Sequence, residues 1–417
     1  MLKGKSLMVS ALSAVVILYI LLGSYLFKVD ASQKKTYVAL DTFQMVYKLA
    51  LDKYVDPVNP NKLIRGALKG LLESVDGYSA YFKKDEYEFI QKRGNMKGDV
   101  GIVLSPHMGY YKIMAIVPNS PASRSGLLVG DTISEINGKG ISEYDYLYVK
   151  ALLKGKVGDS VKIGVQRGSD EDDLYETNIV REVVKEKIVS ADLLQGEIGY
   201  LKVYAILPGS ESVVKREIEN LKNKGAKKLI LDLRETYGNG YEDAVSISDL
   251  FLKKGIITIL KCKDKIIKKY IASPEVLFTG EVVVLINGTT WQAPEIVASS
   301  LKENKRARVV GFKTFGGAAL GKFIPMKDGD VLYLTHEVFC APSGKPFISQ
   351  KTRFSGVRPD VKYPPEEFAM DLYSKYILGK GNVAVKYYKE YKKRVYEKQL
   401  QKAIEILKMN EKLRKAA

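Results

Sequence analysis

The stretch that decides the fold is Asn287-Gly288-Thr289-Thr290-Trp291-Gln292-Ala293-Pro294-Glu295-Ile296-Val297-Ala298, which follows the apolar run Val282–Ile286. A short, uninterrupted apolar run is typical of a buried strand. Pro294 favours the first turn of a helix, because its missing N–H is not needed there. The sequence therefore predicts a strand, a tight turn and a helix, which is a common mount for a catalytic nucleophile.

Further motifs stand in a fixed order on both sides of this elbow. They are Val75-Asp76-Gly77-Tyr78-Ser79-Ala80-Tyr81, Leu231-Asp232-Leu233-Arg234, Thr314-Phe315-Gly316, Pro342-Ser343-Gly344-Lys345 and Gly356-Val357-Arg358-Pro359-Asp360. Together with the elbow they resemble the carboxyl-terminal processing peptidases, also called tail-specific serine proteases, of peptidase family S41. Each motif is weak alone, and their shared order carries the resemblance.

The three catalytic positions that the resemblance implies are all substituted. The family's reactive serine falls on Gln292, its general-base lysine on Gly317, and the glutamine that orients the lysine on Gly321. Nucleophilic catalysis needs an activatable hydroxyl or thiol beside a base, and a third group that holds the base. These three residues supply none of them, so we expect a catalytically inactive homologue.

Neighbouring side chains could replace the missing groups only with difficulty. Lys313 precedes the base position by four residues, which in a strand is about 13 Å. A general base must lie within about 3 Å of the group whose proton it accepts. Ser299 and Ser300 belong to the predicted helix, where hydroxyls usually bond back to the preceding turn. Thr290 lies two residues before the nucleophile position.

The oxyanion turn of the family is altered as well. After Leu231–Arg234 the family has an Asn-Asn-Pro-Gly-Gly run, whose glycines present backbone N–H groups to the developing oxyanion. Here Gly238 keeps its place, Asn239 stands where the second glycine belongs, and Tyr237 replaces the proline. Asn tolerates left-handed backbone geometry, so the backbone donors could survive.

Residues 93–170 are predicted to form a PDZ domain. The segments that resemble one are Ser120–Leu127, Gly130–Ile133, Ile136–Gly138 and Leu152–Gly158. PDZ domains add an extended C-terminus to a sheet edge, and backbone N–H groups capture its carboxylate. The resemblance places that loop at Gly98–Ile102. The peptide-binding residues would be Val100, Gly101, Ile102, Val103 and Leu104.

Asp99 complicates this assignment, because a glycine is often found near its position in the family. Its carboxylate would repel an incoming carboxylate unless it pointed to water. Two hypotheses therefore stay open. In one the groove binds protein C-termini, and in the other a PDZ fold carries a vestigial groove.

An apolar segment opens the chain. Lys3 and Lys5 precede an uncharged run from Ser6 to Phe27 that is dense in Val, Leu and Ile. About 20 apolar residues span a bilayer, and the run exceeds the apolar region of a typical cleaved signal. We expect residues 6–27 to be a transmembrane signal anchor of a single-pass protein of the cell membrane, with the bulk of the chain extracytoplasmic. Cleavage at Val29-Asp30-Ala31 would instead give a secreted form.

Composition excludes several classes. The 417 residues, 46% hydrophobic and 27% charged, suffice for two or more folded domains. The net charge of +18 would attract anionic lipid headgroups or wall polymers, although dispersed lysines on a solvated surface explain it equally. No nucleic-acid module is legible, so no nucleic-acid partner is expected.

Cysteine and histidine are too few for a metal centre. Cys262 and Cys340 could pair in an oxidising compartment, but their spacing specifies neither a disulfide framework nor a metal site. His107 and His336 lie far apart in sequence. We therefore expect no metal and no cofactor.

Trp291, the only tryptophan, stands where the family has alanine, beside the lost nucleophile. A large indole there could plug the specificity pocket. Packing in the core is the alternative.

Two helices with one apolar stripe each flank the domains, and in the resembled family such helices help to build dimers. Their stripe residues are Leu63, Ile64, Ala67, Leu68, Leu71 and Leu72, and Tyr396, Leu400, Ala403, Ile404 and Leu407. A homodimer and packing onto the same chain are both compatible with the stripes.

The expected fold class is multidomain α+β. The ranges are 6–27 for the transmembrane anchor, 36–92 for a helical N-terminal region, 93–170 for the PDZ domain, 180–365 for the mixed α/β S41 peptidase-like core and 366–417 for C-terminal helices. The first functional hypothesis is an inactive homologue that binds protein C-termini or a partner protease as a scaffold or regulator. The alternative is an active serine-type endopeptidase with non-standard catalytic residues.

Overall fold

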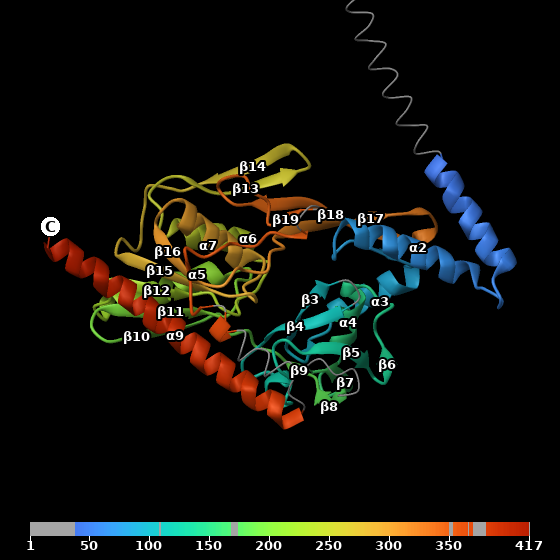
Figure 1. Ribbon diagram of the computed structural model, residues 1–417, viewed down its shortest axis with the longest axis horizontal. Coiled ribbons are helices and arrows are strands. Elements are labelled where there is room, and N and C mark those ends of the chain that lie inside the picture. Colours follow the sequence, from blue (N-terminus) through green and yellow to red (C-terminus); the bar gives the residue numbers. More distant parts are fainter. Residues whose placement is uncertain are drawn as a thin grey trace, which may run out of the picture. The chain divides into compact units, whose positions relative to one another are not determined.

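The computed structural model describes residues 38–107, 110–167, 174–349, 353–365, 367–369 and 381–416 (Figure 1). The chain divides into two compact units, Met1–Leu71 and Leu72–Ala417. In the first unit residues 38–53 are helical and α2 (Pro60–Val75) begins, as the apolar spacing predicts. The predicted span 6–27 lies outside the described residues. Within the described part of the chain, no helix is both long and apolar enough to cross a membrane.

The second unit contains the PDZ domain, built on a six-stranded sheet with the strand order β3-β4-β5-β7-β8 and β6 paired to β5. Its strands are β3 (Ile102–His107), β4 (Tyr110–Ile116), β5 (Thr132–Ile136), β6 (Lys139–Gly140), β7 (Ser160–Gln166) and β8 (Leu174–Val180). Helix α4 (Tyr146–Leu153) packs on this sheet through Val149 and Leu153. Because β3 lies at one end of the order, one edge of it carries no strand partner among the described residues.

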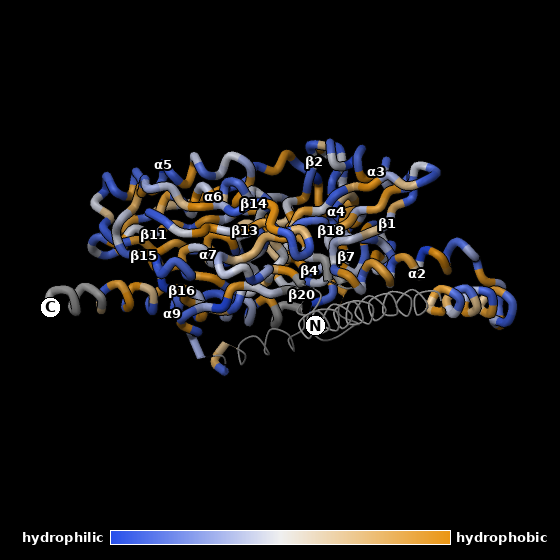
Figure 2. The backbone as a smooth tube through the Cα atoms, turned by 90° about the horizontal axis from the view of Figure 1, so that it is seen from above, coloured by the Kyte–Doolittle hydropathy of each residue, from blue (hydrophilic) through white to orange (hydrophobic). Residues whose placement is uncertain are grey.

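The core domain is a mixed α/β fold on a second six-stranded sheet with the order β10-β11-β12-β15-β16-β21. Its strands are β10 (Val189–Leu193), β11 (Ile198–Val203), β12 (Lys228–Asp232), β15 (Glu281–Ile286), β16 (Ala307–Gly311) and β21 (Val361–Lys362). All neighbours are parallel except β10, which runs antiparallel to β11. A parallel sheet is buried on both faces, which explains why β15 is apolar at nearly every position. In Figure 2 its strands are correspondingly hydrophobic, whereas the outer helix α5 (Ser210–Asn223) carries many hydrophilic residues.

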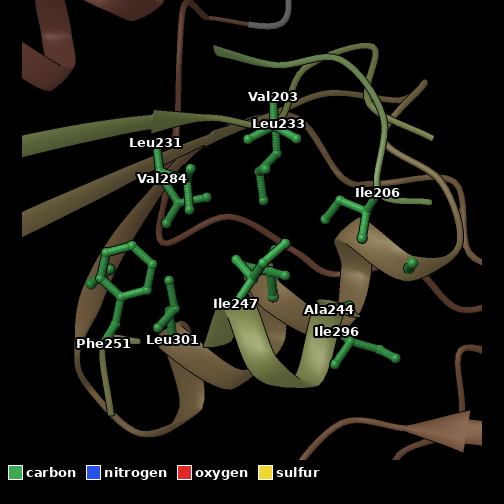
Figure 3. Packing of buried hydrophobic residues seen from close by; sticks show 14 of the residues in the cluster. Val203, Ile206, Leu231, Leu233, Ala244, Ile247, Phe251, Val284, Ile296 and Leu301 are labelled. Atoms are coloured by element: carbon green, nitrogen blue, oxygen red, sulfur yellow. The ribbon is translucent and has the colours of Figure 1, made fainter. Parts of the chain in front are cut away.

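Helices cover both faces of this sheet. Helices α5, α6 (Tyr241–Asp249) and α7 (Ala293–Glu303) pack on the face of Leu231 and Val284. Figure 3 shows this packing for residues of α6 and α7. Helix α9 (Gly381–Ala416) packs on the other face, where Ala403 and Leu407 contact Ile230 and Val283. The C-terminal apolar stripe thus packs onto its own chain, which was one of the two alternatives.

A further sheet joins the N-terminal part of this unit to the core. Its order is β1-β18-β13-β14, and β17 pairs with β18. The strands are β1 (Ala80–Phe82), β13 (Ile256–Cys262), β14 (Lys265–Ile271), β17 (Ala319–Pro325) and β18 (Val331–Cys340). Helix α3 (Lys84–Gly94), the short pair β2 (Gly98–Asp99) with β9 (Glu182–Val183), and the pair β19 (Ile348–Ser349) with β20 (Arg353–Phe354) complete the unit. Cys262 and Cys340 are both free thiols.

Candidate functional site

The predicted strand, turn and helix form as expected, with β15 ending at Ile286 and α7 beginning at Ala293. Asn287 fixes the turn, because its Oδ1 accepts hydrogen bonds from the N–H of Glu235 at 3.0 Å and from that of Thr289 at 3.2 Å. At the corner Gln292 has φ 66° and ψ −120°. A non-glycine residue adopts such a conformation only where its surroundings enforce it, and a nucleophile elbow is one such place. The chain keeps the elbow geometry and presents an amide side chain on it.

A buried carboxylate ties the elbow to the segment that follows β16. Glu295 accepts hydrogen bonds from the Gln292 N–H at 3.0 Å, the Thr314 hydroxyl at 2.5 Å and the Gly316 N–H at 2.7 Å. Burial raises the pKa of Glu295 to about 8, against the opposing effect of these donors. Glu295 is therefore a positioning residue for both chain segments around the site.

The indole of Trp291 occupies the space beside the predicted base position. Trp291 is 2% exposed, and its Nε1 donates to the Tyr78 hydroxyl at 3.0 Å while the two rings stack. Gly317 has φ 127°, and a Cβ added there would lie 2.8 Å from Trp291 Nε1 and closer still to the Tyr78 oxygen. Contacts under 3.0 Å essentially never occur for real Cβ atoms. The stacked pair thus fills the room that a side chain at Gly317 would need.

The position of the orienting glutamine is filled in the same way. A Cβ on Gly321 would lie 2.6 Å from Cε1 of Tyr333, and the ring carbon Cζ and the hydroxyl oxygen would be closer. Tyr333 projects from β18 against Phe323 on the neighbouring strand. Two aromatic side chains, Trp291 and Tyr333, therefore stand at two of the three positions where the catalytic side chains are missing.

In the predicted oxyanion turn, a backbone N–H that could bind an oxyanion is already hydrogen-bonded within the protein. The N–H of Ala293, which follows the nucleophile position, donates to the Gly238 carbonyl at 2.9 Å. Gly238 has φ 134°, and a Cβ on it would lie 2.7 Å from the Ile206 carbonyl carbon, so only glycine fits. The adjacent N–H of Trp291 donates to the Thr236 carbonyl at 2.9 Å. An oxyanion would have to displace the first of these bonds to be bound.

The neighbouring hydroxyls have structural partners. Ser299 and Ser300 donate to the carbonyls of Ile296 and Val297 within α7, at 3.1 and 3.0 Å, as expected for a helix interior. The Thr290 hydroxyl is fully buried and donates to the Leu233 carbonyl at 2.6 Å. Lys313 lines a different cavity, which it shares with Phe312 and Arg358.

A cavity of about 580 Å³ joins the PDZ groove to the predicted catalytic cleft. On the PDZ side it is lined by Gly101–Leu104 at the start of β3 and by Tyr146, Leu147 and Lys150 of α4. On the core side it is lined by Gly238, Asn239, Trp291, Gln292, Gly317 and Gly321. The structure thus brings the two sets of predicted site residues together in one cavity. Val100 differs, because its side chain is fully buried in the PDZ core.

The polar side chains that line this cavity belong to tyrosines, lysines, two carboxylates, Asn239, Gln292 and one threonine, Thr335. Tyr78, Tyr146, Tyr237, Tyr241 and Tyr333 all line it. Burial raises the pKa of each of these tyrosines, so their hydroxyls stay protonated and are poor bases. Among the described residues that line it there is no serine, cysteine or histidine.

A group of charged residues at the junction of the two domains could not be found from the sequence. Glu186, in the segment between the domains, accepts a hydrogen bond from the Tyr237 hydroxyl at 2.6 Å. Burial raises the pKa of Glu186 and lowers that of Lys150, and both interact electrostatically with Asp99. The one available signal was Tyr237 itself, which replaces the family's proline. In the described part of the chain, no cluster of three or more His, Cys, Asp or Glu side chains could hold a metal ion.

The structure combines a PDZ domain with a core whose parallel sheet carries a strand–turn–helix elbow. This combination is typical of serine-peptidase-like proteins of the tail-processing class. Residues 197–363 match the model of peptidase family S41, residues 112–167 match a PDZ domain, and residues 24–86 match the N-terminal domain of the activating protease CtpB. The chain therefore carries an S41 peptidase domain and a PDZ domain, and it is a homologue of the carboxy-terminal processing proteases.

Individual relatives agree with this family. The carboxy-terminal-processing protease of Bartonella bacilliformis is 28% identical over 339 residues, which are 79% of this chain and 76% of the relative. The carboxy-terminal processing protease CtpA of Bacillus subtilis is 28% identical over 335 residues, covering 79% and 70% of the two chains. The photosystem II D1 C-terminal processing protease superimposes with a TM-score of 0.63 at 20% identity, covering 81% of this chain and 92% of that structure, which shows the shared fold.

Proposed function

We propose that the protein is a catalytically inactive S41 homologue that binds polypeptide in the cavity between its PDZ domain and its core, and acts as a scaffold or regulator, for example of a partner protease. The observation that carries this proposal is the Trp291–Tyr78 pair, which fills the space beside Gly317 while Gln292 occupies the elbow. A peptidase cleft that lacks both the nucleophile and the base can still bind a polypeptide and stabilise an oxyanion, but it has no other catalytic contribution left. The bond between Ala293 and Gly238 removes part of the latter as well.

The open edge of β3 supports polypeptide binding. An extended segment can add to a free sheet edge through main-chain hydrogen bonds, and its alternate side chains can enter pockets. Here the edge residues Ile102, Val103 and Leu104 face the cavity opposite Tyr146 and Leu147 of α4. A bound segment would continue from this groove toward the core cleft.

For the cellular setting we propose a protein held at the cell membrane by residues 6–27, with its other domains outside the cytoplasm. Helix 38–53 exposes Leu40, Phe43, Val46 and Leu49 in the isolated chain. Exposed apolar stripes of this kind support a homodimer. The match of residues 24–86 to an N-terminal domain of a related protease agrees with that proposal.

The test is a cleavage assay on the full chain in detergent micelles with unfolded proteins that end in small apolar residues. The matching variant restores the three catalytic side chains and removes two of the three obstructing rings: Trp291→Ala, Gln292→Ser, Gly317→Lys, Gly321→Gln and Tyr333→Ala. Its control has the same changes without Gln292→Ser. We expect no cleavage by the natural protein or by the control, and cleavage by the restored variant. Cleavage by the natural protein would instead support an active endopeptidase with non-standard residues.

A further inference from the structure

The loop that should capture a ligand carboxylate already holds a carboxylate of its own. The N–H of Gly101, in the middle of the predicted capture loop, donates to Oδ1 of Asp99 at 3.0 Å. In a PDZ domain such backbone N–H groups are the donors that bind the terminal carboxylate of the ligand. Asp99 thus takes one donor that a chain end would need.

The loop is held in this arrangement by several backbone contacts. Gly98 and Gly155 exchange two hydrogen bonds of 3.0 and 2.9 Å, which fix the start of the loop to the end of α4. Gly101 has φ 81°, and a Cβ on it would lie 2.5 Å from the Ser120 hydroxyl oxygen, so the turn is closely packed. The Gly101 carbonyl accepts from the Val117 N–H at 2.9 Å. Asp99 therefore caps a loop whose backbone is fixed.

Charged side chains of both signs surround the loop. Asp99 and Glu186 line the same cavity. The nearby cations Lys150 and Arg181 both interact electrostatically with Asp99, and Lys150 interacts with Glu186 too. Lys97 and Lys154 line the cavity as well. The feature that disfavours a terminal carboxylate is therefore the Gly101 N–H that Asp99 already uses, and not the net charge of the lining.

The cavity does not end at Asp99. Glu186, Tyr237 and Gly238 extend it toward the elbow, and Asp99 interacts electrostatically with both Glu186 and Tyr237. A chain that occupied the β3 edge could pass the loop and continue into the core cleft. A groove of this form suits a segment with residues on both sides of the bound part.

We propose that the PDZ groove of this protein takes internal extended segments rather than free C-termini, because Asp99 replaces the ligand's terminal carboxylate. This inference rests on the proposed polypeptide-binding function and specifies its ligand class. It differs from the expectation, drawn from the sequence, that the groove binds protein C-termini. It also gives Asp99 a role, which is to accept the hydrogen bond that a ligand's terminal carboxylate would otherwise accept.

The experiment compares one short fluorescent peptide of alternating apolar residues, prepared with a free C-terminal acid and with a C-terminal amide. Binding to the full chain in detergent micelles is measured by fluorescence anisotropy. The variants are Asp99→Gly, which frees the Gly101 N–H, and Asp99→Asn, which keeps an oxygen acceptor without the charge. The control Asp192→Asn makes the same charge change at an exposed residue of β10.

We expect the natural protein and the control to bind the amide at least as tightly as the acid. Asp99→Gly should shift the ratio of the two affinities about tenfold toward the acid, which is about 1.4 kcal/mol, and Asp99→Asn should lie between. A natural protein that prefers the acid, or a ratio that Asp99→Gly leaves unchanged, would overturn the inference and leave the proposed function standing. No binding of either peptide to any variant would overturn both.

Discussion

Adding a single methyl group at Gly317 tests whether the base position is filled. In Gly317→Ala the new Cβ would lie 2.8 Å from Trp291 Nε1 and closer to the Tyr78 oxygen, at a backbone φ of 127°. Overpacking a closely packed site costs about 1–3 kcal/mol. A side chain in a sparsely populated backbone region costs about 1–3 kcal/mol more. The two lower limits together give a loss of at least about 2 kcal/mol in the free energy of unfolding.

Gly288→Ala is the matched control, because it adds the same methyl group in the same region. Its Cβ would meet only the Lys313 carbonyl, at an ordinary 3.9 Å. Substitutions at such sites usually change the free energy of unfolding by less than about 0.5 kcal/mol. In a Trp291→Ala background the cost of Gly317→Ala should fall, because one of the two obstructing groups is gone.

The assay is urea unfolding followed by circular dichroism, in which a shift of the midpoint at constant slope reports a change in stability. Gly317→Ala should unfold at a clearly lower urea concentration than Gly288→Ala. Equal midpoints for the two variants would refute the reasoning, since they would show that the space beside Gly317 is open.

Further predictions concern stability and binding. Because burial raises the pKa of Glu295 to about 8, its contribution is fully present below the unfolded pKa and is lost as the pH rises through about 8. Between pH 5 and 8 the free energy of unfolding of the natural protein should fall by about 1.4 kcal/mol per pH unit relative to that of Glu295→Gln. Parallel pH profiles of the two unfolding free energies would contradict this. Arg234→Met removes the short ion pair of the buried Asp232 carboxylate and leaves only the longer one to Lys202, so it should cost about 3–5 kcal/mol in the free energy of unfolding. Arg124→Met breaks an exposed pair and should cost less than about 1 kcal/mol; similar losses would count against the assigned burial. Trp291 is the only tryptophan and lines the cavity, so its emission should change on saturable peptide binding; binding with an unchanged spectrum would place the ligand elsewhere.

Elements that depend on local sequence were predictable. The apolar run before Asn287 became β15, and Pro294 lies in the first turn of α7, because strand burial and helix starts leave signals in neighbouring residues. The same holds for Ser299 and Ser300, whose hydroxyls bond back within the helix. The order of the motifs was enough to assign the family.

The filling of the vacant site was not predictable in the same way. Gly317 and Gly321 are recognisable in sequence as losses, but the rings that occupy their space come from positions 78, 291 and 333. Only the fold brings these together. Trp291 illustrates the limit: it is packed in a buried cluster and it also lines the cavity, so the two alternatives drawn from sequence were not exclusive.

The sequence also could not predict the hydrogen bonds that occupy the backbone N–H groups expected to bind a ligand. The bond from the Ala293 N–H to Gly238 depends on the meeting of two loops, and the bond from the Gly101 N–H to Asp99 depends on a side-chain rotamer. The charge of Asp99 is evident in the sequence, whereas its role as an acceptor within the loop depends on the folded structure. A simple restoration of serine, lysine and glutamine would likewise overlook the aromatic rings that must be removed first.

The central claim is that no side chain in this cavity can attack a carbonyl. The most direct measurement treats the natural full chain with a fluorophosphonate, which forms a covalent ester with activated hydroxyls, and determines the intact mass. We predict that the mass stays unchanged while the restored variant gains one adduct. A stoichiometric adduct on the natural protein, mapped to a residue that lines the cavity, would contradict the account.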